Sequence, residues 1–302
     1  MVVRTLTRVE IKFQLEKPIA FQSFSGFSSR GLLYEMLRGV DVEYAEMLHS
    51  SPILAPFSST PIYTLTPKGW AVVYKRLPAP SICKVCFTLM NREIAARVFE
   101  ALANDIPLRL QGVEVLPLEV SLEQIKYSNL LEKAKPVRDF TIDFLTPTYF
   151  RFSPLIAARL FPFKLPLRGV DAERLKRARR FHPLPEPIML MRSILRLWRN
   201  YSDTHFNYAR YSRWITSMGI ALSGFPEGIK TMRLYEHKTL RKFIVGFLGS
   251  VHYSIPEDLY KKRWARITDA LLRFAEYTNV GGGRTAGLGM IKYVPKETKS
   301  TS

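Results

Sequence analysis

The chain has 302 residues, of which 47% are hydrophobic and 24% charged, and its formal net charge is +19. This composition excludes an intrinsically disordered chain and is sufficient for two domains with separate cores. No apolar run reaches the roughly 18 residues that a membrane-spanning helix needs, and the charged, alternating N-terminus is unlike a signal peptide, so we expect a cytoplasmic protein.

Residues 1–125 follow the pattern of a small α+β domain. "RVEIKFQLE" alternates apolar and polar residues, which predicts a half-buried strand, and "NREIAARVFEALAND" starts at a capping Asn91 and continues with helical spacing. In chain order we expect a strand (8–16), helices (28–40, capped by Ser28 or Ser29, and 42–51), a strand pair (60–67 and 69–76), a strand (82–90), a helix (91–105) and extended segments (107–125). This order is that of a ferredoxin-like domain.

Cys83 and Cys86 lie in the predicted strand "ICKVCFTLM". Three positions apart on a strand, their side chains face opposite sides, and no further ligands stand at the spacing of a zinc site. We therefore expect two small buried side chains, with neither a disulfide framework nor a metal site.

From about residue 126 a similar order begins again. In chain order we expect a strand (137–152, stopped by Pro147), a helix (185–203), three strands (213–225, 228–237 and 242–255), a helix (255–280) and a last strand (287–294). Residues 159–185 interrupt this order as an insertion or a mobile segment. The prediction is an α+β protein with domains at 1–125 and 138–302, joined by a linker at 126–137, each an antiparallel sheet with helices on one face.

The positive charge belongs almost entirely to the second part of the chain. Residues 1–125 hold 13 Lys/Arg against 12 Asp/Glu, whereas residues 126–302 hold 32 against 14. Such an excess predicts a polyanionic partner, either nucleic acid or an anionic membrane surface. Because no free amphipathic helix supports the membrane alternative, we expect nucleic acid as the partner and no membrane.

The motifs of several catalytic classes are missing. The sequence has no G-x-x-x-x-G-K-[ST], no G-x-S-x-G, no H-E-x-x-H and no acidic pair suited to two metal ions. We therefore expect no metal and no cofactor. RNA can be cut without either, because its 2′-hydroxyl can attack the adjacent phosphorus if the protein positions it, transfers protons and stabilises the developing charge.

Two stretches carry a family resemblance, "RGLLYEMLRGVDVEYAEMLHSSPILAPFSSTPIY" (30–63) and "VGGGRTAGLGMIKY" (280–293). With "DFLTPTYFRF" and "FIVGFLGSVHY" between them, the chain resembles the CRISPR-associated endoribonucleases of the Cas-six type, within the RAMP superfamily. The resemblance spans the whole chain. It implies two tandem ferredoxin-like (RRM-like) domains, a glycine-rich loop before the last strand, and cleavage of long precursor transcripts within each repeat.

The resemblance also implies a catalytic pair. The family's helical tyrosine matches Tyr34 in "GLLYEML", and its histidine matches His49 in "EMLHSS", 15 residues later. Read without the family, His49 is a residue at a helix end and Tyr34 a packing residue. The family's lysine position holds Ala55, so another cation must supply its charge; the candidates are Arg30, Arg38 and Lys230.

The glycine-rich loop, residues 281–289, is the predicted RNA-binding element. Glycines let a phosphate or a base approach the backbone amides closely, although a flexible turn without a ligand remains the alternative. Basic runs at 174–180 and 260–267 are expected to contact phosphates, and the aromatic and cationic residues of 196–211 to stack on bases or pack in the core. The expected RNA-binding residues are Gly281, Gly282, Gly283, Arg284, Thr285, Gly287, Gly289, Lys230, Arg233 and Lys238.

The hypothesis is a metal-independent endoribonuclease that cuts CRISPR precursor RNA within repeats, leaving a 2′,3′-cyclic phosphate and a 5′-hydroxyl. Its expected partners are repeat RNA, as precursor and as mature guide RNA. The missing lysine keeps an alternative open, a non-cleaving RNA-binding RAMP subunit of a CRISPR interference complex. Association with other subunits of such a complex and homodimerisation are left open.

Overall fold

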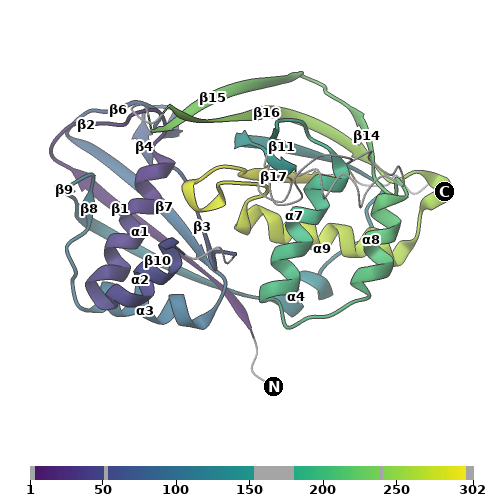
Figure 1. Ribbon diagram of the computed structural model, residues 1–302, viewed down its shortest axis with the longest axis horizontal. Helices are drawn as coiled ribbons and strands as arrows, with labels where there is room; N and C mark the ends of the chain where they lie inside the picture. The colour runs from purple at the N-terminus through teal and green to yellow at the C-terminus, as the bar shows by residue number, and fades with distance from the viewer. Residues whose placement is uncertain (1–3, 51–53, 153–179, 238–240, 297–302) are drawn as a thin grey trace, which may run out of the picture.

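The computed structural model describes residues 4–50, 54–152, 180–237 and 241–296. Two antiparallel sheets lie side by side, the first formed by the N-terminal part of the chain and the second by the C-terminal part (Figure 1). The predicted α+β class with two ferredoxin-like domains is therefore confirmed. Among the described residues, no helix is both long and apolar enough to span a bilayer.

The first sheet has the strand order β10-β1-β7-β4-β5, and β3 also pairs with β7. Its inner strand β1 buries alternate residues, as its sequence predicts. Two short strand pairs, β2 with β6 and β8 with β9, lie outside this sheet. The bounds are β1 Thr5–Leu15, β2 Ile19–Ala20, β3 Phe57–Ser59, β4 Tyr63–Thr66, β5 Gly69–Val72, β6 Arg76–Leu77, β7 Ser81–Leu89, β8 Arg109–Leu110, β9 Val113–Glu114 and β10 Leu116–Lys126.

Helices α1 (Gly26–Val40), α2 (Val42–Ser50) and α3 (Arg92–Ala103) pack in the same core as this sheet. The predicted cap of α3 is confirmed, since the Asn91 side chain accepts a hydrogen bond from the N–H of Ile94 at 3.1 Å. The predicted caps of α1, Ser28 and Ser29, are wrong because the helix starts earlier, after Ser25. The Ser25 hydroxyl instead donates to the Val73 carbonyl and accepts from the Ile62 N–H, which fixes the start of α1 against the strands.

The second sheet has the order β14-β16-β11-β17, with β15 paired to β16. Its core includes buried residues of α7 and α9, among them Trp198 and Phe274, whose rings meet at 5.2 Å. The bounds are β11 Asp139–Thr148, β12 Phe150–Phe152, β13 Arg180–His182, α7 Pro187–Tyr201, α8 Tyr208–Thr216, β14 Ala221–Gly224, β15 Ile229–His237, β16 Lys242–Ser254, η1 Glu257–Leu259, α9 Lys262–Thr278, η2 Arg284–Ala286 and β17 Ile291–Pro295.

Two local predictions in this domain are wrong. The strand expected at 213–225 begins only at Ala221, because Tyr211, Trp214 and Ile215 are buried at helical spacing as part of α8. Pro147 does not stop its strand, since β11 continues to Thr148 across an irregular register. Most of the predicted insertion at 159–185 lies outside the described residues.

The region predicted as a linker, 126–137, contains a short helix, α4 (Tyr127–Glu132). Tyr127 is fully buried, and its ring lies 5.7 Å from that of Trp198 and 5.8 Å from that of Phe274. The first turn after β10 thus packs into the second core. This packing fixes the direction in which the chain leaves the first sheet.

The long hairpin of β15 and β16 reaches from the second sheet across the top of the first domain (Figure 1). Near its end, the Tyr235 carbonyl accepts a hydrogen bond from the Ser23 hydroxyl. Leu234 and Ile244 of the hairpin share a buried cluster with Phe24 of the first domain. The hairpin is therefore one of the places where the two domains contact each other.

Candidate functional site

Tyr34 and His49, the predicted catalytic pair, lie in contact. Tyr34 is on α1 and His49 near the end of α2, and their ring centroids are 5.3 Å apart with an interplanar angle of 85°. The tyrosine is 8% exposed, and its hydroxyl donates to the Leu48 carbonyl at 3.4 Å. The histidine is exposed at the surface. The short connection between the two helices therefore places a buried phenol against an accessible imidazole.

Burial raises the pKa of the Tyr34 hydroxyl, against the opposing influence of Arg30 and Arg38. The phenol is therefore protonated at neutral pH and acts as a hydrogen-bond donor. Arg30 precedes Tyr34 by one turn of α1, which places both side chains on the same side of the helix. Arg38 pairs with Glu46 at 3.0 Å, so much of its charge is balanced locally.

The glycine-rich loop and the end of α9 contact the first domain at β3, the strand that follows α1 and α2 in the chain. The Ser59 hydroxyl of β3 donates to the Thr285 carbonyl at 2.8 Å, and the Asn279 side chain donates to the Ser59 carbonyl at 2.9 Å. Ser58 adds a hydrogen bond to the Tyr277 carbonyl. The loop therefore meets residues that follow His49 by about ten positions in the chain.

All five glycines of the predicted RNA-binding loop are required by protein packing, two of them in buried positions. Gly287 has φ +68°, and a Cβ there would lie 2.6 Å from the backbone nitrogen of Pro61. Gly289 has φ +73°, and a Cβ there would overlap the Val280 carbonyl. Both are buried. Gly281, Gly282 and Gly283 are partly exposed, but a Cβ on them would lie 2.3 Å from the Tyr149 carbonyl oxygen, 2.4 Å from the Tyr149 ring and 2.7 Å from the Leu288 side chain, respectively.

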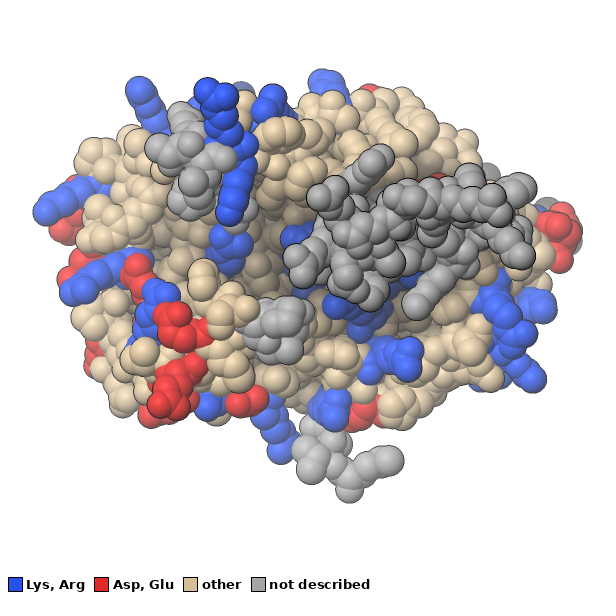
Figure 2. Space-filling model, viewed as in Figure 1, with Lys and Arg blue, Asp and Glu red and all other residues tan. Residues whose placement is uncertain are grey.

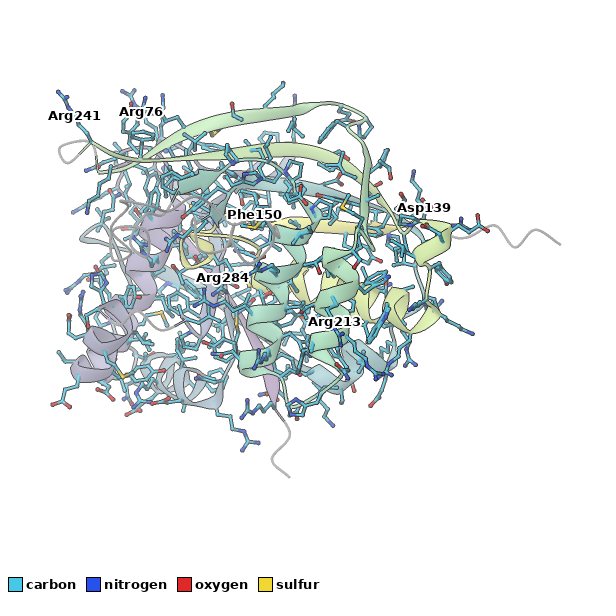
Figure 3. The ribbon with its side chains drawn as sticks, turned by 45° about the vertical axis from the view of Figure 1, so that its right-hand side comes forward. Arg76, Asp139, Phe150, Arg213, Arg241 and Arg284 are labelled. Carbon is cyan, nitrogen blue, oxygen red and sulfur yellow. The ribbon has the colours of Figure 1, made fainter. Side chains whose placement is uncertain are left out.

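Arg284 points into the junction between the two domains (Figure 3). It is 7% exposed, and its guanidinium donates to the carbonyls of Thr278 and Ala55, both at 3.3 Å. Burial lowers its pKa to about 10, and the nearby charge of Arg196 acts in the same direction. At neutral pH the side chain remains a cation. It therefore lies beside the position where the family pattern has its lysine.

A pocket of about 750 Å³ lies between α7 and the glycine-rich loop. Its wall includes Gly281, Gly282, Gly283, Arg284 and Thr285, so the exposed half of the predicted loop faces one space. The opposite wall is α7, which contributes three arginines. Arg151 of β12 and Leu54, which follows α2 in the chain, also line the pocket. Neither His49 nor Tyr34 lines this pocket.

Sequence reasoning named Arg196 and Arg199 among residues that could contact bases, but it missed Arg192 and Arg151. The signal for Arg192 was available, because positions 192, 196 and 199 repeat at four and three residues and fall on one face of α7. That face is opposite to the buried Met191, Ile194 and Trp198. No comparable spacing indicates Arg151.

Two further predicted RNA-binding residues, Lys230 and Arg233, belong to the hairpin. Lys230 and Arg233 are exposed on β15, and the Arg233 guanidinium lies 3.8 Å from the Phe243 ring centroid and 4.9 Å from that of Tyr235. Lys238 lies outside the described residues, as does nearly all of the basic run 174–180. Neither Lys230 nor Arg233 lines the α7 pocket.

Charge is unevenly spread over the face that Figure 2 shows. Acidic side chains gather at the lower left, over the first domain, whereas Lys and Arg side chains gather around the middle and at the lower right. The basic run 260–267 provides exposed Lys261, Lys262, Arg263 and Arg266 at the start of α9. Within the described ranges, no three His, Cys, Asp or Glu side chains cluster as a metal ion would require.

Comparison with known proteins connects this arrangement to one family. Residues 142–291 match the family model of the CRISPR-associated endoribonuclease Cas6. No curated protein matches the chain.

The chain is also similar to solved structures along nearly its full length. They include a Cas6 product complex (20% identity, TM-score 0.70, 96% of this chain and 100% of that chain), Thermus thermophilus Cas6 (18%, 0.66, 97% and 100%) and a Cas6 substrate mimic complex (18%, 0.61, 96% and 99%). At these identities the likeness shows the shared fold.

Proposed function

Because the chain belongs to the Cas6 family of CRISPR-associated endoribonucleases, we propose that it cuts CRISPR precursor RNA once within each repeat. The contact between Tyr34 and the exposed His49 is the observation that supports this most. It joins a proton-transferring group and a phenol at the edge of the surface on which the glycine-rich loop docks. The RNA ligand is supported by the Cas6 relatives described as product and substrate mimic complexes.

The reaction is a transesterification. The 2′-oxygen of one nucleotide bonds to the adjacent phosphorus, the bond from phosphorus to the 5′-oxygen breaks, and the products are a 2′,3′-cyclic phosphate and a 5′-hydroxyl. One proton leaves the 2′-hydroxyl and one reaches the 5′-oxygen. Neither step needs a metal ion or a cofactor, so the proposed reaction is metal-independent.

His49 transfers a proton at the reacting phosphate. Its ring is accessible, and imidazole is the side-chain group best suited to exchanging protons near neutral pH. Tyr34 orients this ring by edge contact, since its own hydroxyl donates to the Leu48 carbonyl and its raised pKa keeps it protonated. Arg30 and Arg38, each one turn of α1 from Tyr34, are the candidates on this helix to stabilise the charge that develops on the phosphate oxygens.

The glycine-rich loop and the hairpin hold the RNA. Gly281, Gly282 and Gly283 present backbone to the α7 pocket, where a phosphate can approach closely. Lys230 and Arg233 contact the RNA from the hairpin, where both are exposed. Arg284 contributes its charge from within the wall. Gly287 and Gly289 act indirectly, by allowing the loop to dock on the first domain.

One observation favours a second candidate function. Ala55 stands where the family pattern has a lysine, so the chain could be a non-cleaving RNA-binding subunit of a CRISPR interference complex. This candidate keeps the basic surface and the pocket but has no turnover. The buried Arg284 at Ala55 leaves the local charge positive, which favours the enzyme.

The two candidates are separated by incubating the purified protein with a repeat-containing RNA in EDTA. The enzyme gives one cut per repeat with a cyclic phosphate end, and a single 2′-deoxy substitution at the cut site prevents that cut. Binding of the RNA without any product would favour the non-cleaving subunit. Cleavage that occurs only when divalent ions are restored would overturn the metal-independent mechanism.

A further inference from the structure

The segment between α2 and β3 is held by two side chains of the second domain. Tyr201, at the end of α7, donates its hydroxyl to the Leu54 carbonyl, and Arg284 of η2 donates to the Ala55 carbonyl at 3.3 Å. The two donors are 147 and 229 positions away from these carbonyls in the chain. Two consecutive backbone carbonyls of the first domain are therefore bound from across the domain boundary.

Both donors are fixed by their own surroundings. The Arg284 guanidinium also donates to the Thr278 carbonyl at the end of α9, and the residue is buried. Tyr201 is likewise buried. Hydrogen bonds from buried donors are electrostatically stronger than those exposed to water. The two contacts therefore hold Leu54 and Ala55 rigidly against the second domain.

The start of α1 lies against the same loop. A Cβ added at Gly26, the first residue of α1, would lie 2.1 Å from the Ala286 carbonyl oxygen. Only a glycine allows the helix to approach η2 this closely. The glycine-rich loop thus contacts both the helix that carries Tyr34 and the segment that follows His49.

His49 lies near the end of a short helix. α2 has nine residues and buries Tyr44, Ala45 and Leu48, and a helix of this length is marginally stable by itself. Leu54 follows His49 by five positions, so a hold on its carbonyl limits how far the end of α2 can move. Proton transfer needs the two heavy atoms within about 2.6–3.2 Å, and a misplacement of about 1 Å can cost about 10²-fold in rate.

We propose that Tyr201 and Arg284 are positioning residues of the cleavage centre. By holding the Leu54 and Ala55 carbonyls they fix the segment that follows His49, so the geometry for proton transfer depends on the docking of the second domain. This inference rests on the proposed function, in which His49 transfers the proton. Tyr201 is not among the described residues that line the α7 pocket, so its hydroxyl acts on the protein and not on the RNA.

The test is Tyr201→Phe, which removes one hydroxyl and changes neither the ring nor the charge. The single-turnover cleavage rate at saturating protein should fall by about tenfold or more, because the segment after His49 loses one of its two holds. The affinity for repeat RNA should change by less than about twofold, because no charge is removed.

Tyr253→Phe is the matched control. Tyr253 is also buried, and its hydroxyl donates to the Pro185 carbonyl at 2.9 Å, within the second domain. This variant loses a hydrogen bond of the same kind, so its thermal midpoint should fall to a similar extent while its cleavage rate stays that of the wild-type protein. A merely structural role for Tyr201 would make the two variants alike in both measurements.

Arg284→Lys tests the second donor. The variant keeps the positive charge but replaces the planar fork, which reaches two carbonyls, by a single ammonium group. We expect a lower rate at saturating protein with the affinity for RNA kept. In the double variant Tyr201→Phe, Arg284→Lys, the loss of rate should be smaller than the product of the two single losses, because both side chains hold the same segment.

Amide hydrogen exchange tests this hold without cleavage. The peptide from Leu48 to Thr60 should exchange faster in Tyr201→Phe than in Tyr253→Phe. Equal exchange in these two variants, equal cleavage rates in them, or a loss of affinity as large as the loss of rate would each overturn the inference. If the wild-type protein binds the RNA but never cuts it, the proposed function fails, and the exchange still decides whether Tyr201 holds this segment.

Discussion

The docking of the glycine-rich loop on the first domain is best tested by Gly287→Ala. Gly287 has φ +68°, and an added Cβ would lie 2.6 Å from the Pro61 nitrogen and 2.8 Å from the carbonyl carbon of Thr60. Both atoms are backbone, so neither can move away as a flexible side chain would. Either the loop must therefore shift away from the backbone after β3, or the backbone of Thr60 and Pro61 must move.

The expected cost has two parts. A left-handed backbone at a residue other than glycine costs roughly 1–2 kcal/mol, and a forced overlap in a packed region typically costs a further 1–3 kcal/mol. The total is about 2–5 kcal/mol, and at about 2–4 °C for each kcal/mol in a chain of this size, the thermal midpoint should fall by about 5 °C or more. The assay is thermal unfolding followed by circular dichroism.

Gly112→Ala is the matched control. Gly112 has φ +79° but no atom within 4 Å of an added Cβ, so it carries the backbone cost alone, roughly 1–2 kcal/mol. The difference between the two variants measures the contact between the domains. Equal midpoints for the two variants would refute the reasoning, since the loop would then not be pressed against Pro61.

Three further predictions concern buried polar groups. Tyr34→Phe should lower the free energy of unfolding by about 1 kcal/mol. It should also lower the single-turnover cleavage rate, but by less than the roughly 10²-fold that is typical when a proton-transfer group is lost. An unchanged rate would show that the hydroxyl has no part in the mechanism. Burial raises the pKa of Tyr34 and Tyr293 in the folded state, so the urea midpoint should stay level below about pH 10, where unfolded tyrosine ionises, and fall above it; a midpoint that rises there contradicts the assignment. Asp269 is 1% exposed and accepts hydrogen bonds at 2.8 Å from Tyr293 and from Arg273, so Asp269→Asn should cost about 3 kcal/mol in urea unfolding, whereas the exposed Asp258→Asn should cost much less, and equal losses would count against a structural role.

Most of the fold could be predicted because its strands and helices carry strong periodicities. β1 alternates buried and exposed residues, and α3 has its cap at Asn91, as the sequence indicates. The prediction of a strand over 213–225 is wrong in its first half, because a short apolar run fits both the two-residue period of a strand and the 3.6-residue period of a helix. Trp214 and Ile215 are buried side chains of helix α8. The chain leaves this helix through Met218, which has φ +64°, and Gly219.

The candidate site was only partly accessible to sequence reasoning. The proximity of Tyr34 and His49 follows from a helix pair that the local sequence specifies, although their roles stay predictions. The burial of Arg284 could not be read from its neighbours, because an arginine among glycines suggests an exposed side chain. Its partner Ala55 is 229 positions away in the chain, so only the docking of the two domains brings them together.

The central claim is that an accessible imidazole on the first domain cuts an RNA strand held by the second. The most direct measurement is the single-turnover cleavage rate of His49→Ala at saturating protein, beside His205→Ala, which removes an exposed ring from the second domain. We predict a loss of about 10²-fold or more for His49→Ala with RNA affinity unchanged, and no loss for His205→Ala. A loss below about tenfold for His49→Ala, with binding intact, would contradict proton transfer by this residue.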